Sequence, residues 1–233
     1  MSHIALECVE IEKWFGAGRR KVFALKDASF SLDFGQMTYV MGPSGSGKSS
    51  LIAALSGLQA PDRGQVMVPD GNLWERSPSK ITKFRQEYCG FVFQNVGLFP
   101  ALSALDQIIL PLKLVGISSR EARKRALEAL EWVGLSSQIK SKPNQMSGGE
   151  GQRVAIARML AKQPSLIFCD EPTSALDREN GSIVVQLLRR AAIEKNAMVF
   201  CSTHDDRIVH FADRVIEVED GVLIKDSENP ESV

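Results

Sequence analysis

The sequence predicts an α/β fold with a largely parallel sheet, and three observations point to it. Several apolar runs of four or five residues are bounded by polar or helix-breaking residues, which is typical of strands buried on both faces. Segments with helical character separate these runs, so successive strands can be joined by helices and run parallel. A glycine-rich turn also joins the first of these runs directly to a helix.

The composition is that of an ordinary globular protein. The chain has 233 residues, of which 44% are hydrophobic and 24% are charged. Its 28 basic and 28 acidic residues cancel, so no global field steers it onto nucleic acid, and we expect no nucleic-acid partner. The four cysteines lack metal-site spacing and are interpreted as reduced core residues of a cytoplasmic protein: Cys8, Cys89, Cys169 and Cys201.

Neither a signal peptide nor a membrane-spanning helix is expected. Glu7 and Glu10 occur before any apolar run of signal-peptide length. The uncharged stretch over residues 88–105 is interrupted by polar residues and by Gly97 and Pro100, so it does not predict a membrane span.

The elements around the sheet follow from short patterns. Buried strands are expected at residues 37–41, 90–93, 166–169 and 198–202. A helix over residues 48–56, closed by Gly57, follows the first strand.

The middle of the chain, roughly residues 98–160, is expected to be helical. Ser118 and Glu121 have capping-box spacing ahead of an apolar stripe, which predicts an amphipathic helix. A second helix is expected from about residue 150 to residue 162, where Pro164 stops it.

The end of the chain predicts a β-hairpin followed by a tail. Asp220 and Gly221 separate two apolar runs, residues 215–218 and 222–224. Residues 226–233 are mostly polar, and we expect them to form a frayed, flexible tail.

Residues 42–49 match the phosphate-loop pattern G-x-x-x-x-G-K-[ST] between an expected strand and an expected helix. Glycines let the backbone N–H groups wrap a phosphate at the helix start, Lys48 adds a positive charge, and the Ser49 hydroxyl is a Mg²⁺ ligand. A chance Gly/Ser turn is disfavoured because the eight-residue pattern, with all four of its fixed positions matched, lies between an expected strand and an expected helix. The predicted nucleotide-binding residues are Gly42, Pro43, Ser44, Gly45, Ser46, Gly47, Lys48, Ser49 and Ser50.

Two further segments carry chemistry. An apolar strand ends at Asp170 and Glu171, which could hold a metal and activate water, although adjacent carboxylates also cap helices. Because this acidic pair occurs together with the phosphate-loop residue Lys48, the catalytic interpretation is favoured. Residues 146–153 form a second glycine cluster at a helix start, with Ser147 99 positions after Lys48, and this is another site suited to anions.

With these motifs in this order, the chain resembles the nucleotide-binding subunit of ABC transporters over nearly its whole length. Residues 146–152 resemble the family signature LSGGQ, Phe93 and Gln94 the glutamine loop, and His204 the switch histidine. The family D-loop corresponds to Ser174, Ala175, Leu176 and Asp177.

The resemblance implies a single domain over residues 1–233 with a RecA-like P-loop NTPase core. It also implies an N-terminal antiparallel β subdomain and an α-helical subdomain inserted at approximately residues 98–160. Within the family, residues 143–158 and 205–215 are similar to the compact LolD, MacB and FtsE class, and the end of the chain also resembles DevA-type exporters. Met146 stands where the family has Leu, a volume-conserving change, and Glu150 stands where it has Gln.

The resemblance also implies ATP and Mg²⁺ as cofactors and assigns a role to each site residue. Phe15, or alternatively Trp14, would stack on adenine. Ser49, Gln94 and Asp170 would ligate Mg²⁺. Glu171 would be the general base and His204 would hold the γ-phosphate. The signature residues Ser147, Gly148, Gly149 and Glu150 would cover the ATP of a second copy, and Asp177 would contact that copy.

The partners implied are a second ATPase subunit and two integral membrane permease chains of the MacB, LolC, LolE or FtsX kind, with a periplasmic adaptor reached through the permease. The chain would lie on the inner face of the cytoplasmic membrane and drive export or lipoprotein extrusion.

An FtsE-type signalling ATPase is the alternative. A soluble repair or translation ATPase is disfavoured, because the gap between Lys48 and Ser147 leaves no room for a coiled coil and there is one cassette. A nucleotide-binding scaffold that does not hydrolyse ATP is disfavoured, because Glu171 and His204 are both present.

Overall fold

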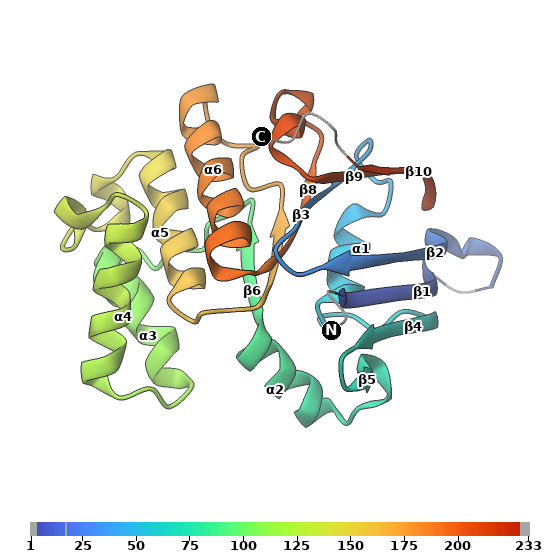
Figure 1. Ribbon diagram of the computed structural model, residues 1–233, viewed down its shortest axis with the longest axis horizontal. Helices are drawn as coiled ribbons and strands as arrows, with labels where there is room; N and C mark the ends of the chain where they lie inside the picture. The colour runs from blue at the N-terminus through green and yellow to red at the C-terminus, as the bar shows by residue number, and fades with distance from the viewer. Residues whose placement is uncertain (1–3, 17, 229–233) are drawn as a thin grey trace.

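The computed structural model describes residues 4–16 and 18–228 and confirms the α/β class with a mainly parallel sheet. Its six-stranded sheet has the order β10-β9-β3-β8-β7-β6, and all neighbours are parallel except β9 and β10 (Figure 1). The strands are β3 (Met37–Met41), β6 (Cys89–Phe93), β7 (Leu166–Asp170), β8 (Met198–Thr203), β9 (Arg214–Glu219) and β10 (Val222–Glu228).

A second, antiparallel sheet has the order β2-β1-β4-β5 and is formed by the N-terminal part of the chain. Its strands are β1 (Ile4–Phe15), β2 (Val22–Asp33), β4 (Arg63–Val68) and β5 (Gly71–Asn72). The antiparallel arrangement agrees with the one that the family resemblance implies.

The helices form layers on both faces of the six-stranded sheet. Helix α1 lies between this sheet and the antiparallel one, whereas α5 and α6 pack on the opposite face with α3 and α4 beyond them (Figure 1). The helices are α1 (Lys48–Leu55), α2 (Pro78–Tyr88), α3 (Ala104–Leu114), α4 (Ser119–Trp132), α5 (Gly148–Leu160) and α6 (Arg178–Lys195). Short 3₁₀ turns are η1 (Gly18–Arg20), η2 (Leu73–Glu75), η3 (Ser136–Gln138), η4 (Pro143–Gln145) and η5 (Asp206–Phe211). In the part of the chain that the structure describes, no helix has the length and apolarity needed to cross a membrane.

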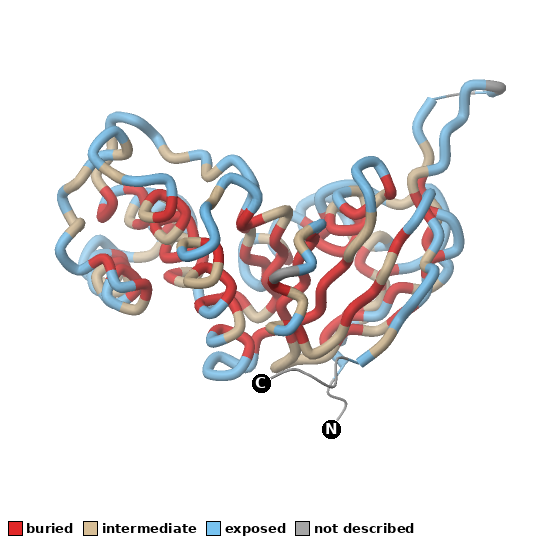
Figure 2. Tube along the Cα trace, turned by 90° about the horizontal axis from the view of Figure 1, so that it is seen from above, coloured by how far each residue is buried: buried red, intermediate tan, exposed pale blue. Residues whose placement is uncertain are grey.

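The central strands are apolar without interruption because each of their faces packs into a different core. In β8, Val199 and Cys201 pack with the α3–α6 helices, whereas Met198 and Phe200 pack with α1 and the antiparallel sheet. Figure 2 shows buried segments running through the centre of the molecule with exposed chain at its rim. The four cysteines are buried and free, as the sequence predicted.

The predicted boundaries of α5 were wrong by two residues at each end. Helix α5 begins at Gly148 because the Ser147 side chain caps it, and it ends at Leu160. The chain turns away before Pro164, since Gln163 has a positive φ of 58°. The capping box predicted at Ser118 is half formed: its hydroxyl accepts the Glu121 N–H, while the Glu121 carboxylate pairs with Arg125 instead.

The predicted flexible tail also needs correction. Residues 226–228 belong to β10, and Asp226 accepts hydrogen bonds from Arg214 at 2.7 Å and 2.6 Å. Because Arg214 also donates to the carbonyl of Ser31 in β2, this pair ties the hairpin to the antiparallel sheet. Residues 229–233 lie outside the described part of the chain.

Candidate active site

The phosphate loop, residues 42–49, joins β3 to α1 and is wedged between two other strands. A Cβ atom on Gly47 would lie 2.1 Å from the carbonyl oxygen of Ala24 in β2. A Cβ atom on Gly42 would lie 2.0 Å from the carbonyl oxygen of Val218 in β9. Both glycines also have positive φ, so the loop shape depends on residues without a side chain.

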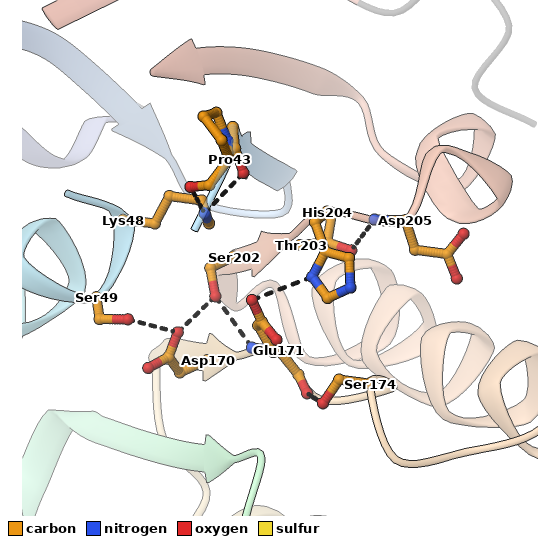
Figure 3. Close-up of polar contacts among 11 residues, drawn as sticks. Pro43, Lys48, Ser49, Asp170, Glu171, Ser174, Ser202, Thr203, His204 and Asp205 are labelled. Carbon is orange, nitrogen blue, oxygen red and sulfur yellow. Dashed lines mark hydrogen bonds and ion pairs between the residues drawn. The ribbon is translucent and has the colours of Figure 1, made fainter. Parts of the chain in front are cut away.

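Lys48 lies folded over this loop, with its ammonium group at the loop carbonyls. Its Nζ atom donates to the carbonyl oxygens of Gly42 at 2.7 Å and Pro43 at 2.8 Å (Figure 3). Burial lowers the pKa of Lys48, and the negative charges of Glu171 and Asp170 oppose that shift. The group is thus a partly desolvated cation for which an anionic ligand is a favourable partner.

Asp170 connects the start of α1 to the ends of two strands. Its Oδ1 atom accepts hydrogen bonds from Ser49 Oγ at 3.1 Å and from Ser202 Oγ at 2.6 Å (Figure 3). Ser202 Oγ also accepts the backbone N–H of Glu171 at 3.0 Å. Ser202 was not among the site residues predicted from the sequence, although its place at the end of a buried strand was a usable signal.

Glu171 and His204 are brought together by the ends of β7 and β8. Glu171 Oε1 lies 3.1 Å from His204 Nδ1, and the Glu171 backbone has a positive φ of 48° (Figure 3). Such a conformation is uncommon for a non-glycine residue, and strained residues of this kind cluster at functional sites. Ser174 Oγ holds it by donating to the Glu171 carbonyl at 3.1 Å. Glu171, Ser174 and His204 line a pocket of about 330 Å³, which has room for water beside the carboxylate.

Gln94 is exposed and lies directly after β6, at the same edge of the sheet. The parallel register places Phe93 opposite Asp170, so Gln94 follows at the neighbouring strand end. The structure thereby gathers the ends of β3, β6, β7 and β8, which carry all the residues predicted to contact phosphate or metal within one chain.

The signature residues are placed elsewhere. Ser147 caps α5, which lies on the opposite face of the six-stranded sheet from α1 (Figure 1). A Cβ atom on Gly149 would lie 2.1 Å from the side-chain oxygen of Asn180. Asn180 in turn donates to the D-loop residue Asp177, at 2.9 Å from its backbone nitrogen and 2.7 Å from its side chain. The start of α5 and the predicted D-loop residue Asp177 are therefore packed together through Asn180.

The two candidate adenine-stacking rings differ in their surroundings. Phe15, at the end of β1, is 47% exposed. The Trp14 ring is covered by Lys21, whose Nζ atom lies 3.2 Å from the ring centroid, and it packs edge-on against Phe23. Phe15 is thus the more accessible of the two rings.

The strand before Phe15 is anchored by Asp62, a residue that was not predicted from the sequence. Asp62 Oδ2 accepts the backbone N–H of Trp14 at 2.9 Å and lies 3.1 Å from Lys13 Nζ. Burial raises the pKa of Asp62, but the hydrogen bonds from Trp14 and Lys13 outweigh it and lower the pKa below its ordinary value of 3.8.

A phosphate loop, an acidic strand end and a histidine-paired glutamate define a P-loop nucleoside triphosphatase. Comparison with known proteins gives the family: a model described as ABC transporter matches residues 25–174, more than half of the chain. The chain therefore belongs to the ABC transporter family, as an ATP-binding and ATP-hydrolysing domain.

Three curated relatives show the extent of the similarity. The macrolide export ATP-binding/permease protein MacB of Neisseria gonorrhoeae is 39% identical over 97% of this chain, but the chain spans only 35% of that relative's length. The putative hemin import ATP-binding protein HrtA of Staphylococcus haemolyticus is 39% identical, over 94% of this chain and 99% of its own. The uncharacterized ABC transporter ATP-binding protein MJ0796 of Methanocaldococcus jannaschii is 40% identical, over 91% of this chain and 92% of its own.

The solved structures that are similar include two of MJ0796. One is a dimer in a post-hydrolysis state bound to ADP and Pi, with a TM-score of 0.86 and 36% sequence identity over 96% of this chain and 98% of that one. A second dimeric MJ0796 structure has a TM-score of 0.87 over the same share of each chain.

Alanine substitutions at two phosphate-loop glycines should separate the cost of a positive φ from the cost of a clash with a neighbouring strand. Gly45→Ala meets open space, and only its positive φ of 83° disfavours it, by about 1–2 kcal/mol. Gly47→Ala adds a backbone clash and should lower the free energy of unfolding by roughly 1–3 kcal/mol more. Urea denaturation without nucleotide measures both variants, and equal losses would contradict the packing of Gly47 against β2.

Asp62→Asn should change the pH dependence of stability. Because the folded state lowers the pKa of this carboxyl, its contribution is present above pH 3.8 and is lost as the pH falls through the folded-state value. The variant should therefore have a lower free energy of unfolding than the parent at pH 7. This difference in free energy should become smaller below about pH 4. Denaturation curves across this range, with Asp70→Asn as an exposed control, test the assignment; a gap that does not change with pH would refute it.

Proposed function

We propose that this chain is the ATPase subunit of a transport complex, working as a homodimer that closes around two ATP molecules. The observation that carries the proposal is the separation of its two anion-suited helix starts. Helices α1 and α5 lie on opposite faces of one sheet, so a single chain cannot bring both to one phosphate group. A second copy supplies the missing half, and the dimeric MJ0796 structures support this arrangement.

In the proposed dimer, the triphosphate lies on the phosphate loop of one copy, from Gly42 to Ser50, with Lys48 neutralising its charge. Phe15 stacks on the adenine ring. The signature of the partner subunit, from Ser147 to Glu150, covers the γ-phosphate with its helix start. Binding of each nucleotide then links two subunits, so ATP favours the closed dimer by mass action.

For hydrolysis, Glu171 is the general base toward the attacking water. His204, 3.1 Å from Glu171, orients the carboxylate and contacts the γ-phosphate. Asp177 and the rest of the D-loop, Ser174, Ala175 and Leu176, contact the partner subunit. These residues position the reacting groups and neutralise charge, and they form no covalent intermediate. Positioning and charge neutralisation are the main requirements of phosphoryl transfer.

The residues at the strand ends also fit a magnesium ion. Ser49, Asp170 and Gln94 offer hydroxyl, carboxylate and amide oxygens, the ligand type that Mg²⁺ prefers. The described residues hold no cluster of three acidic, histidine or cysteine side chains, which suits an ion held partly by phosphate oxygens. When bound, Mg²⁺ would neutralise charge on the phosphates.

The membrane partner in this proposal is a MacB- or LolD-type permease, with the chain on the inner face of the cytoplasmic membrane and a periplasmic adaptor reached through the permease. The naming of a relative as the MacB export protein supports this class. Exposed apolar side chains at the end of α3, including Leu114 at 78% exposure and Val115 at 42%, offer a surface to such a partner. Export or lipoprotein extrusion follows from this permease type.

Glu171→Gln tests the proposal directly. The variant should still bind ATP, lose roughly 10²–10⁴-fold in turnover, and accumulate closed dimers, because only the base is removed. Phosphate release and light scattering after size-exclusion chromatography measure the two effects. Near-normal turnover would remove Glu171 from its role, and a variant that stays monomeric with saturating ATP and magnesium would refute the dimer.

Lys48→Ala is the matched control. It should abolish nucleotide binding in calorimetry and prevent ATP-dependent dimerisation, since the charge that faces the phosphates is lost.

A further inference from the structure

The signature of this chain carries a carboxylate, Glu150, whose two oxygens are both engaged. Oε2 accepts the backbone N–H of Ser147 at 2.8 Å, and the Glu150 N–H returns a bond to Ser147 Oγ at 3.2 Å. Oε1 accepts from the side-chain amide of Gln138 at 3.1 Å. Both carboxylate oxygens of Glu150 are therefore hydrogen-bonded to groups of its own chain, and the negative charge is directed toward these donors rather than toward a bound phosphate.

These bonds have a fixed direction. A carboxylate only accepts, so the amide nitrogen of Gln138 must face Glu150 and its oxygen must face the other way. That oxygen accepts the hydroxyl of Ser141. The backbone carbonyl of Ser141 in turn accepts the N–H of Ala104, the first residue of α3, at 2.9 Å.

The same direction decides what the Ser147 hydroxyl can do. Its oxygen already accepts the Glu150 N–H, and within residues 4–16 and 18–228 this hydroxyl donates to no acceptor. Its hydrogen is therefore available to an acceptor beyond the start of α5. A phosphate oxygen is such an acceptor.

We propose that Gln138 and Glu150 are positioning residues, forming with Ser141 and Ser147 a relay that aims the Ser147 hydroxyl at the nucleotide of the partner subunit. The inference rests on the proposed dimer and deepens it. The relay links the signature to the start of α3, the helix whose far end carries the exposed apolar side chains. It also gives Glu150 a role that explains how a negative residue is accommodated beside an anion site.

Charge exchange within the relay is the test, made in the Glu171→Gln background so that closed dimers accumulate. Gln138→Glu places two carboxylates against each other and should weaken ATP-dependent dimerisation about tenfold, the effect of losing one hydrogen bond to a charged group. Adding Glu150→Gln should restore dimerisation, because the new amide donates to the Glu that replaces Gln138 and still accepts the Ser147 N–H. Glu150→Gln alone should weaken dimerisation less than Gln138→Glu does, since the new amide oxygen still accepts the Ser147 N–H and Gln138 can turn its amide toward Ser141.

Gln145→Glu is the matched control, because the side-chain oxygen of Gln145 accepts a bond from the backbone N–H of Lys142 and a carboxylate keeps that bond. In every variant, nucleotide affinity of the monomer should stay unchanged, since the phosphate loop is untouched. With Glu171 intact, Gln138→Glu should raise the KM for ATP more than it lowers kcat. A Gln138→Glu variant that dimerises like its parent, or a double variant as weak as the single one, would overturn the relay.

Amide hydrogen exchange separates this inference from the proposed function. Gln138→Glu should speed exchange at the Ser147 and Glu150 amides of the monomer, and the double variant should slow it again. Unchanged exchange would overturn the relay whatever the dimer does. A parent that stays monomeric with ATP would overturn the proposed function and, with it, the role toward the partner's nucleotide, while faster exchange would still establish the hydrogen-bond path.

Discussion

The hydroxyl of Ser202 is the contact on which the catalytic arrangement depends. It donates to Asp170 and accepts the backbone N–H of Glu171, so one side chain of β8 holds the last residue of β7 and the residue that follows it. This is possible because β7 and β8 are parallel neighbours with Asp170 opposite Ser202. His204 follows two residues later on the same strand end and reaches Glu171 for the same reason.

A second constraint is the close approach of three backbones around the phosphate loop. The carbonyl of Ala24 in β2 lies close to Gly47, and the carbonyl of Val218 in β9 lies close to Gly42. The loop is therefore packed between the antiparallel sheet and the six-stranded sheet. The N–H of Gly221 in the β9–β10 turn also donates to the carbonyl of Ser46 at 3.0 Å. The N-terminal strands and the C-terminal hairpin thus contribute to a phosphate site that neither contains.

In the proposed dimer, each chain supplies two halves of a site. One half gathers cation and carboxylates at the sheet edge, and the other presents a capped helix start on the far helical layer. The second half has its own internal order, since Gly149 packs on Asn180, Asn180 bonds to Asp177, and Glu150 bonds to Gln138. Both halves are therefore preorganised within one subunit, which would reduce the ordering that closure of the proposed dimer requires.

Much of the fold and most of the site could be predicted from the sequence. The strands of the six-stranded sheet, the helix after the phosphate loop and the hairpin at Asp220 and Gly221 lie where periodicity and turn residues placed them, whereas the antiparallel sheet was expected only from the family resemblance. The misplaced ends were those of α5 and the tail: a serine cap starts α5 earlier, the turn at Gln163 ends it earlier, and the Arg214–Asp226 pair accompanies a longer β10. Neither effect is visible in a window of local propensity.

The sequence by itself determined the local chemistry: a glycine loop before a lysine, an acidic strand end and a serine at a helix start each encode their conformation within a few residues. Only the tertiary structure decided which distant groups meet them. Ser202, Asp62 and Gln138 become partners of Asp170, Trp14 and Glu150 through strand register and helix packing, which join residues up to 48 positions apart. Such pairings depend on how whole elements pack, and no short pattern in the sequence specifies them.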